Sequence, residues 1–210
     1  MTSSTTTKGP LILETGFGEF AVRSHNINGD RIVSLVCDDV MSHVPIVRMH
    51  SGCLFAHVFH STHCDCREQF AGAQETIKKH GRGVLLYTES QEGKGHGLDT
   101  KIVEMALQRE AKLDSVEAFK TMGLEPDVRD YANQIAVLRE LRVPKEIYHF
   151  SGNPRKRLAL TSAGFKILGQ FEHCAPLGTQ ALAERNMKQL KMGYVYTETF
   201  PADTKTRGDG

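Results

Sequence analysis

The sequence predicts a single mixed α/β domain, and three observations lead to this class. The chain has 210 residues, enough for one domain with a substantial core. Hydrophobic residues make up 40% and charged residues 24%, as in ordinary globular proteins. Strand-like runs come first along the chain, and helical and strand patterns then alternate, which is typical of mixed α/β architecture.

The expected strands are short runs of alternating or β-branched apolar residues. VLLYT at 84–88, for example, has the length and composition of a buried strand. We expect strands at 18–25, 31–37, 44–49, 84–88, 146–150 and 166–171.

The expected helices carry apolar residues at three- and four-residue spacing. The helix 67–80 has Phe70, Ala73 and Ile77 on one face and ends at Gly81. Further helices are expected at 99–111 with Ile102, Met105 and Ala106 on one face, at 131–142 with Tyr131, Ile135, Leu138 and Leu141 inward, from Pro154, and at 179–192.

The two ends of the chain are polar and are expected to be disordered. They are residues 1–10 and 195–210, and they flank a catalytic domain at 11–194. The net charge of +1 gives no general attraction to nucleic acid or to a membrane, and no run is apolar enough to span a bilayer.

The cysteine usage indicates a cytoplasmic protein. There is no signal peptide, and the cysteine count of five is odd, so the thiols are expected to stay reduced. Clustered cysteines then favour a metal or catalysis over disulfides. Cys37 and Cys174 lie in apolar surroundings and are expected to be core or strand-end residues.

The segment CLFAHVFHSTHCDC at 53–66 holds three cysteines in the pattern C-x10-C-x-C. Cys53, Cys64 and Cys66 fit a catalytic zinc site, which has three protein ligands and an open position. They fit equally a closed structural site completed by a histidine of the segment, His57, His60 or His63, or simply buried reduced thiols.

Three other segments carry polar groups in loops next to predicted elements. QEGKGHGL at 91–98 has glycines that let a ligand approach the backbone, or it is an ordinary strand–helix connection. PDVRDY at 126–131 precedes a predicted helix, so its local pattern predicts that Asp127 caps the helix and that Arg129 is a surface cation. SGNPRKR at 151–157 joins free N–H groups at a helix start to three cations, which suits a phosphate better than a solvated first turn.

Together these segments resemble the GTP cyclohydrolase II family, whose members open the guanine ring of GTP in riboflavin biosynthesis. The resemblance runs from about Gly16 to Pro176. It rests on RMHSGC (48–53), HCDCREQ (63–69), GRGVLLY (81–87), QEGKGHGL (91–98), SVEA (115–118), PDVRDY (126–131) and GNPRKR (152–157). It implies a GTP cyclohydrolase II-like α/β domain that pairs into homodimers, with one Zn²⁺ per chain and Mg²⁺ on the triphosphate.

The resemblance also implies roles for individual residues. Cys53, Cys64 and Cys66 match the zinc ligands, Arg129 the nucleophile that attacks the α-phosphorus, and Asp127 the proton acceptor. The residues that match substrate contacts are Arg48, His50, Ser51, Gln69, Glu92, Gly93, Lys94, Ser115, Ser151 and Lys156.

Departures from the family pattern gather near the three cysteines. Gly52 replaces a usual Glu, His57 an Asp, His63 an Arg and Met105 a Tyr, and Lys94 and Phe119 replace an Arg and an Asn. The pattern indicates that the catalytic and metal-binding residues are retained and that the pocket is altered, with the histidines in the pocket wall.

Besides an ordinary family enzyme, two hypotheses stay open. One is a specialised hydrolase of secondary metabolism that acts on GTP or a related purine nucleotide and stops at another product. The other is a non-catalytic zinc protein that binds nucleotide or only a partner.

Overall fold

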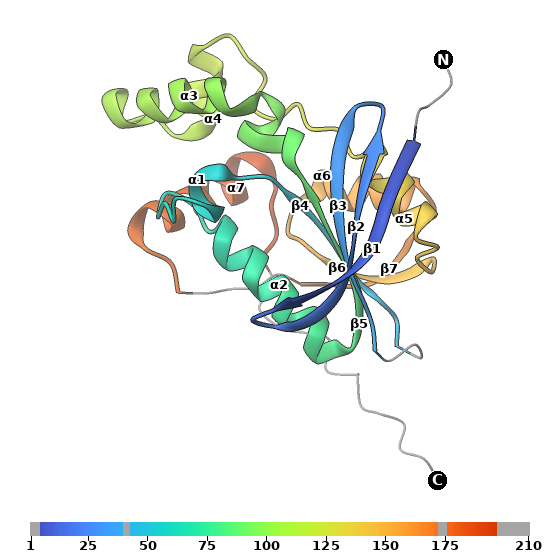
Figure 1. The fold of residues 1–210 in the computed structure, drawn as a ribbon. Helices are drawn as coiled ribbons and strands as arrows, with labels where there is room; N and C mark the ends of the chain where they lie inside the picture. The colour runs from blue at the N-terminus through green and yellow to red at the C-terminus, as the bar shows by residue number, and fades with distance from the viewer. Residues whose placement is uncertain (1–4, 40–42, 172–175, 197–210) are drawn as a thin grey trace.

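The structure is a computed structural model that describes residues 5–39, 43–171 and 176–196. A seven-stranded mixed sheet in the order β1-β2-β3-β5-β4-β6-β7 forms its centre (Figure 1). The strands are β1 (Thr5–Thr15), β2 (Gly18–Ile27), β3 (Asp30–Asp38), β4 (Ile46–Ser51), β5 (Arg82–Thr88), β6 (Glu146–Phe150) and β7 (Lys166–Phe171). The sheet and its helices confirm the expected mixed α/β class.

The sheet changes from antiparallel to parallel pairing at its middle. Strands β1, β2 and β3 pair antiparallel, as expected where short turns join neighbours in the chain, and β3 also pairs antiparallel with the more distant β5. Strands β5, β4, β6 and β7 pair parallel, so β4, β5 and β6 end at the same edge of the sheet. The loops that follow these strands are therefore brought together.

Helices cover both faces of the sheet (Figure 1). On one face, α2 (Cys66–His80) buries Ala73 and Ile77 against Leu85 and Phe150. On the other face, α5 (Ala132–Glu140) and α6 (Pro154–Ser162) pack against β4 and β6. The remaining helices are α1 (Leu54–His57), the 3₁₀ segment η1 (Glu89–Gly95), α3 (Gly97–Ala111), α4 (Ser115–Thr121) and α7 (Thr179–Met192).

The N-terminal segment differs from the expected disordered end. Thr5–Pro10 form the first half of β1, which pairs with β2 from Thr5 onward. Its threonines are β-branched and suit an extended strand. Pairing with β2 satisfies the backbone N–H and C=O groups of the segment, and a polar composition does not predict whether such pairing occurs. Residues 1–4, most of the expected C-terminal tail and Cys174 lie outside the described residues.

Helix α3 forms where expected but turns another face inward. Ile102 is 50% exposed, whereas Glu104 is only 4% exposed. The apolar face that carries Ile102, Met105 and Ala106 is therefore not the buried face of this helix. The reason is that α3 and α4 project away from the sheet (Figure 1), so the buried side of α3 faces a polar site and not the apolar core.

The sequence patterns missed the short elements α1, η1 and α4, each seven residues or fewer. No helix in the described parts of the chain combines the length and the apolar character needed to cross a membrane.

Candidate active site

The site lies where β4, β5 and β6 end, the edge at which parallel sheets bind ligands. Cys53 follows β4, η1 follows β5, and Ser151 follows β6. These segments line one cavity with α3 and α7, called the site cavity below. The sequence-predicted residues that line it are Arg48, His50, Ser51, Gly52, Cys53, His63, Cys64, Cys66, Gln69, Glu92, Gly93, Lys94, Met105, Ser115, Arg129, Ser151 and Lys156.

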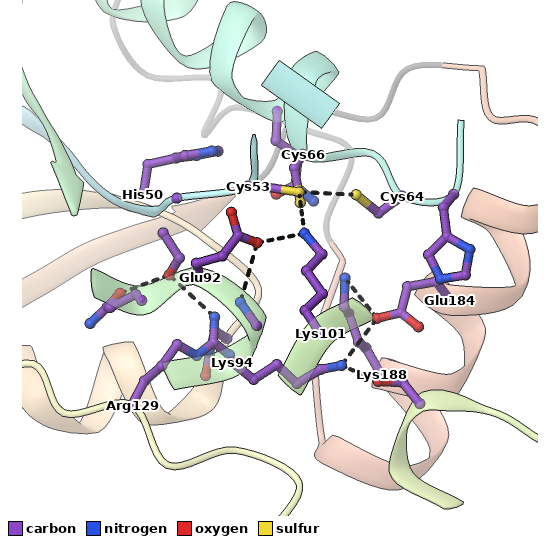
Figure 2. Close-up of a pocket in the computed structure, with 18 of the residues that line it drawn as sticks. His50, Cys53, Cys64, Cys66, Glu92, Lys94, Lys101, Arg129, Glu184 and Lys188 are labelled. Carbon is purple, nitrogen blue, oxygen red and sulfur yellow. Dashed lines mark hydrogen bonds and ion pairs between the residues drawn. The ribbon is translucent and has the colours of Figure 1, made fainter. Parts of the chain in front are cut away.

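The three predicted metal ligands converge at the top of this cavity (Figure 2). The Sγ atoms of Cys53, Cys64 and Cys66 lie within 4.8 Å of one another, and those of Cys53 and Cys64 are 3.7 Å apart. Tetrahedral ligands at the usual Zn–S bond length are separated by roughly 3.8 Å, so this donor set fits zinc. Within the described residues no histidine belongs to this group, which favours three protein ligands over a closed site.

A buried ion pair supports Cys53. Lys101 Nζ lies 3.1 Å from Cys53 Sγ and 2.5 Å from Glu92 Oε1, and Glu92 Oε2 accepts the backbone N–H of Leu54 at 2.5 Å. Hydrogen bonds from Cys64 and Cys66, with the charge of Lys101, lower the pKa of Cys53. Three thiolates around one Zn²⁺ would carry a net charge of −1, which Lys101 would balance.

The histidines of the cysteine segment occupy different places. His63 lines the site cavity, as expected, but His57 does not, and His60 is exposed. His50 Nδ1 lies 3.1 Å from Arg48 Nη2, and arginine only donates, so neutral His50 carries its proton on Nε2. Its Nε2 atom lies 3.1 Å from His57 Nε2. His57 is therefore a buttress behind the cysteines, and its expected place in the pocket wall is wrong.

Gly52 allows a close approach between two of these loops. Its N–H donates to Thr88 O at 2.8 Å, and a Cβ at this position would meet Glu89 O at 3.1 Å. The replacement of the usual Glu thus accompanies tight packing between the end of β4 and η1.

Asp127 and Arg129 form a two-pronged ion pair at the side of the cavity. Arg129 donates from Nε to Asp127 Oδ1 at 2.8 Å and from Nη2 to Asp127 Oδ2 at 2.6 Å. The side chains are only 6% and 9% exposed, so the expectation of a surface cation is wrong. The expectation of a helix cap is wrong as well, because Asp127 accepts from Arg129 and Asp130 accepts the N–H of Ala132 at the helix start.

The protonation of this pair follows from its surroundings. Burial opposes both charges, yet the Arg129 guanidinium lowers the pKa of Asp127. Tyr194, Tyr131 and Asp127 together raise the pKa of Arg129 well above its usual range, although burial works against this. The pair is therefore fully ionised in the structure described here.

Two further cations lie deep in the site. Arg48 and Lys156 are 3% and 5% exposed. Arg48 donates to Gln69 Oε1 at 2.8 Å, and Lys156 donates to Met49 O at 2.7 Å. Ser151 accepts the backbone N–H of Asn153, which caps α6 as the Pro154 signal indicated. Of the three cations expected after β6, Lys156 lines the site cavity, whereas Arg155 and Arg157 are exposed and are not among its lining residues.

The glycine-rich loop aims a lysine into the site. Gly93, Lys94 and Gly95 all have positive φ, and for Lys94 the value is +57°. A non-glycine residue in this conformation is uncommon and is found where surrounding structure enforces it. Lys94 Nζ is hydrogen-bonded to Ser115 Oγ and lies over the ring of Phe119, 5.2 Å from its centroid.

Sequence reasoning missed several residues that line the site cavity. On α3 these are Lys101, Glu104 and Gln108, and their spacing of three and four residues was a polar stripe that could have indicated a site. On and after α7 they are Glu184, Lys188 and Tyr194. Tyr194 Oη lies 3.2 Å from Arg129 Nη2 and 2.7 Å from Asn153 Nδ2, a contact between distant segments that no local pattern contains.

Comparison with known proteins assigns this architecture. The family model described as GTP cyclohydrolase II matches residues 8–172. The chain belongs to the GTP cyclohydrolase II family. The matched range contains the three cysteines, the Asp127–Arg129 pair and the loops that follow β4, β5 and β6, and the resemblance seen in the sequence is thereby confirmed.

Named relatives of this GTP cyclohydrolase II family member are similar over most of its length. A GTP cyclohydrolase-2 of Streptomyces coelicolor is 38% identical over 166 residues, 78% of this chain and 74% of that protein. The riboflavin biosynthesis protein RibBA of Aquifex aeolicus is 40% identical over 159 residues, 74% of this chain and 39% of that protein. A probable bifunctional riboflavin biosynthesis protein of Oryza sativa subsp. japonica is 36% identical over 203 residues, 96% of this chain. The chain spans only 37% of that rice protein.

Proposed function

We propose that this protein hydrolyses GTP, opening the imidazole ring at C8 and releasing pyrophosphate. The observation that carries the proposal is one cavity lined both by a zinc-compatible group of three thiols and by Arg129, whose guanidinium is paired to the buried Asp127 just outside the lining. A chain that only bound nucleotide would need neither the open three-thiol site nor a buried arginine paired to a carboxylate.

The cysteines and their partners prepare the ring-opening half of the cavity. Zinc, when bound, supplies a Lewis acid that generates a water nucleophile near neutral pH. Lys101 balances the thiolate charge at Cys53, and Glu92 fixes the backbone of Leu54 beside it. These contacts orient the ligands before substrate enters.

Arg129 and Asp127 act at the phosphate half of the cavity. A guanidinium is not nucleophilic until it loses a proton, and Asp127 lies within hydrogen-bond distance to accept it. The deprotonated nitrogen then bonds to the α-phosphorus as the bond to the pyrophosphate oxygen breaks, and pyrophosphate leaves. Water then cleaves the nitrogen–phosphorus bond, which releases the nucleotide monophosphate and restores Arg129. The buried Arg48 and Lys156 supply positive potential to this half of the cavity, and Mg²⁺ bound to the triphosphate would screen its charge.

The proposal is tested by incubating the purified chain with GTP, Zn²⁺ and Mg²⁺ and identifying the products by mass spectrometry. Pyrophosphate and a ring-opened pyrimidine nucleotide are expected. Binding of GTP without turnover would instead support the non-catalytic hypothesis. The oligomeric state, expected to be a homodimer, is measured on the same sample by sedimentation.

Met105 favours release of a product that keeps its formyl group. It lines the site cavity where the family usually has a tyrosine, and a thioether cannot donate a hydrogen bond. A missing donor of this kind can cost about 10²–10³ in rate. Removal of the formyl group needs a donor near the formamide, whereas ring opening depends mainly on zinc and its water. We therefore expect the parent to release mainly the formylated nucleotide, with well under one formate per GTP consumed.

This expectation is checked by measuring formate against nucleotide consumed in the parent and in Met105→Tyr. The ratio should be low in the parent and rise in the variant. Met122→Tyr, at the end of α4 and not among the cavity-lining residues, serves as the matched control and should leave the ratio low. One formate per nucleotide in the parent would refute this expectation.

A further inference from the structure

The C-terminal helix α7 contributes a buried carboxylate to the site cavity. Glu184 and Lys188 lie one turn apart on α7, and their side chains are 10% and 13% exposed. Both line the site cavity. They lie beyond residues 8–172 that the family model matches, so membership of the family does not by itself assign them a role.

Two lysines hold Glu184 in its charged form without saturating it. Its Oε1 atom lies 3.6 Å from Lys94 Nζ and 3.5 Å from Lys188 Nζ. Both distances are longer than the roughly 2.7–2.9 Å of a charged N–H···O hydrogen bond. Burial opposes ionisation, but these lysines lower the pKa of Glu184. The carboxylate is thus an ionised acceptor with capacity to receive hydrogen bonds from a ligand.

The position of Glu184 corresponds to one end of a purine nucleotide. In Figure 2 Arg129 and Glu184 lie at opposite sides of the cavity, and the three cysteines lie above them at its top. In a purine nucleotide the phosphates, the ribose, the imidazole ring and the six-membered ring follow one another in that order. If C8 faces the cysteines and the phosphates face Arg129, then the outer edge of the six-membered ring faces α7.

We propose that Glu184 recognises the guanine edge of the substrate, an inference that rests on the proposed function. Its carboxylate accepts hydrogen bonds from the N1–H and the exocyclic amine at N2, which matches the two parallel donors of guanine to the two oxygens of a carboxylate. Lys94 and Lys188 flank this carboxylate, and either can donate to O6. Adenine presents a lone pair at N1 and no amine at C2, so Glu184 would repel it.

The loop that carries Lys94 supports this assignment. Lys94 is held at a positive φ with its ammonium between Glu184 and Ser115, and His63 lines the same cavity, where it is among the groups that lower the pKa of Glu184. Thus two of the residues that depart from the family pattern, Lys94 and His63, surround the base end of the cavity. We therefore expect the specificity for the base to depend on these residues of this chain and not on the usual family pattern.

The test compares the zinc-loaded parent with Glu184→Gln for binding of GTP, ITP and ATP by equilibrium titration. ITP lacks the N2 amine, and ATP reverses the donor pattern. The parent should bind GTP about ten- to a hundredfold more tightly than ATP, with ITP in between, as expected for hydrogen bonds to a charged group. In Glu184→Gln the affinity for GTP should fall by a similar factor, and the differences among the three nucleotides should shrink to a few-fold.

Two controls separate recognition from folding. Glu184→Asp keeps the carboxylate and should keep the order GTP, ITP, ATP at reduced affinity. Glu110→Gln changes an exposed carboxylate on α3 and should alter nothing. An unchanged GTP-to-ATP ratio in Glu184→Gln, or a parent that does not prefer GTP, would overturn the inference. This test measures nucleotide binding and not turnover. An absence of ring opening would therefore refute the proposed function, whereas the binding comparison would still decide whether Glu184 recognises the base.

Discussion

Arg129→Lys is expected to abolish pyrophosphate release from GTP, by about 10³-fold or more, in a chain that still folds. Lysine keeps the positive charge but loses the planar fork that meets both oxygens of Asp127 at 2.6 and 2.8 Å. It also lacks the guanidine nitrogen that is proposed to attack the α-phosphorus. Pyrophosphate is measured directly with a coupled assay, and folding is followed by thermal unfolding.

The contrary outcome has a clear structural meaning. The ion pair is fully charged in this structure, which is also the state of a simple phosphate clamp. If Arg129→Lys released pyrophosphate near the parent rate, Arg129 would be such a clamp and not a nucleophile. Arg157→Lys is the matched control, because Arg157 lies on α6 and reaches Gln170 away from the cavity, and it should behave as the parent.

The regular elements of the fold were predictable because each carries its own local pattern. The strands at 82–88, 146–150 and 166–171 were found from apolar runs. The helix that begins at Pro154 was found from the proline, and the helix that ends before Gly81 from the glycine. The order of strands in the sheet was not predictable in this way, because the pairing of β4 between β5 and β6 depends on crossovers and not on local sequence.

Helix α3 shows where periodicity misleads. A run of apolar residues at helical spacing normally marks the buried face. Here the buried face carries Lys101, Glu104 and Gln108, because the neighbouring surface is a polar cavity and not the core. Ile102 and Val103 are left about half exposed. Such a conflict between local pattern and burial is expected at a functional site.

The parts of the site that motifs carry were predictable, and the parts that tertiary packing carries were not. The three cysteines and the Asp127–Arg129 pair lie close in sequence within short motifs. The contact of Tyr194 with Arg129 joins residues 65 positions apart, and Glu184 reaches Lys94 from a helix outside the matched family range. No spacing rule brings such partners together.

Cys64→Ser is expected to lower zinc content from one ion per chain to a small fraction of that and to abolish ring opening with it. Cys64 Sγ lies 3.7 Å from Cys53 Sγ, which is the separation of two ligands of a tetrahedral zinc ion. Among the described residues, only Cys53, Cys64 and Cys66 form this group of candidate ligands, so no other side chain of the group can replace Cys64. A serine hydroxyl is a far poorer zinc ligand, since it stays protonated near neutral pH. Zinc is measured by atomic emission on dialysed protein, independently of activity.

Cys37→Ala is the matched control for the loss of one thiol. Cys37 is 2% exposed and packs in the core with Phe20 and Leu35, apart from the site cavity. Its removal should reduce stability modestly, by about 1–2 kcal/mol for a small buried side chain, and should leave zinc content at the parent value. If Cys64→Ser retained a full zinc ion, then the metal would be held elsewhere, and the three thiols would be a buried reduced cluster. Loss of zinc in Cys64→Ser alone would instead tie the metal, and the ring opening that depends on it, to this group of cysteines.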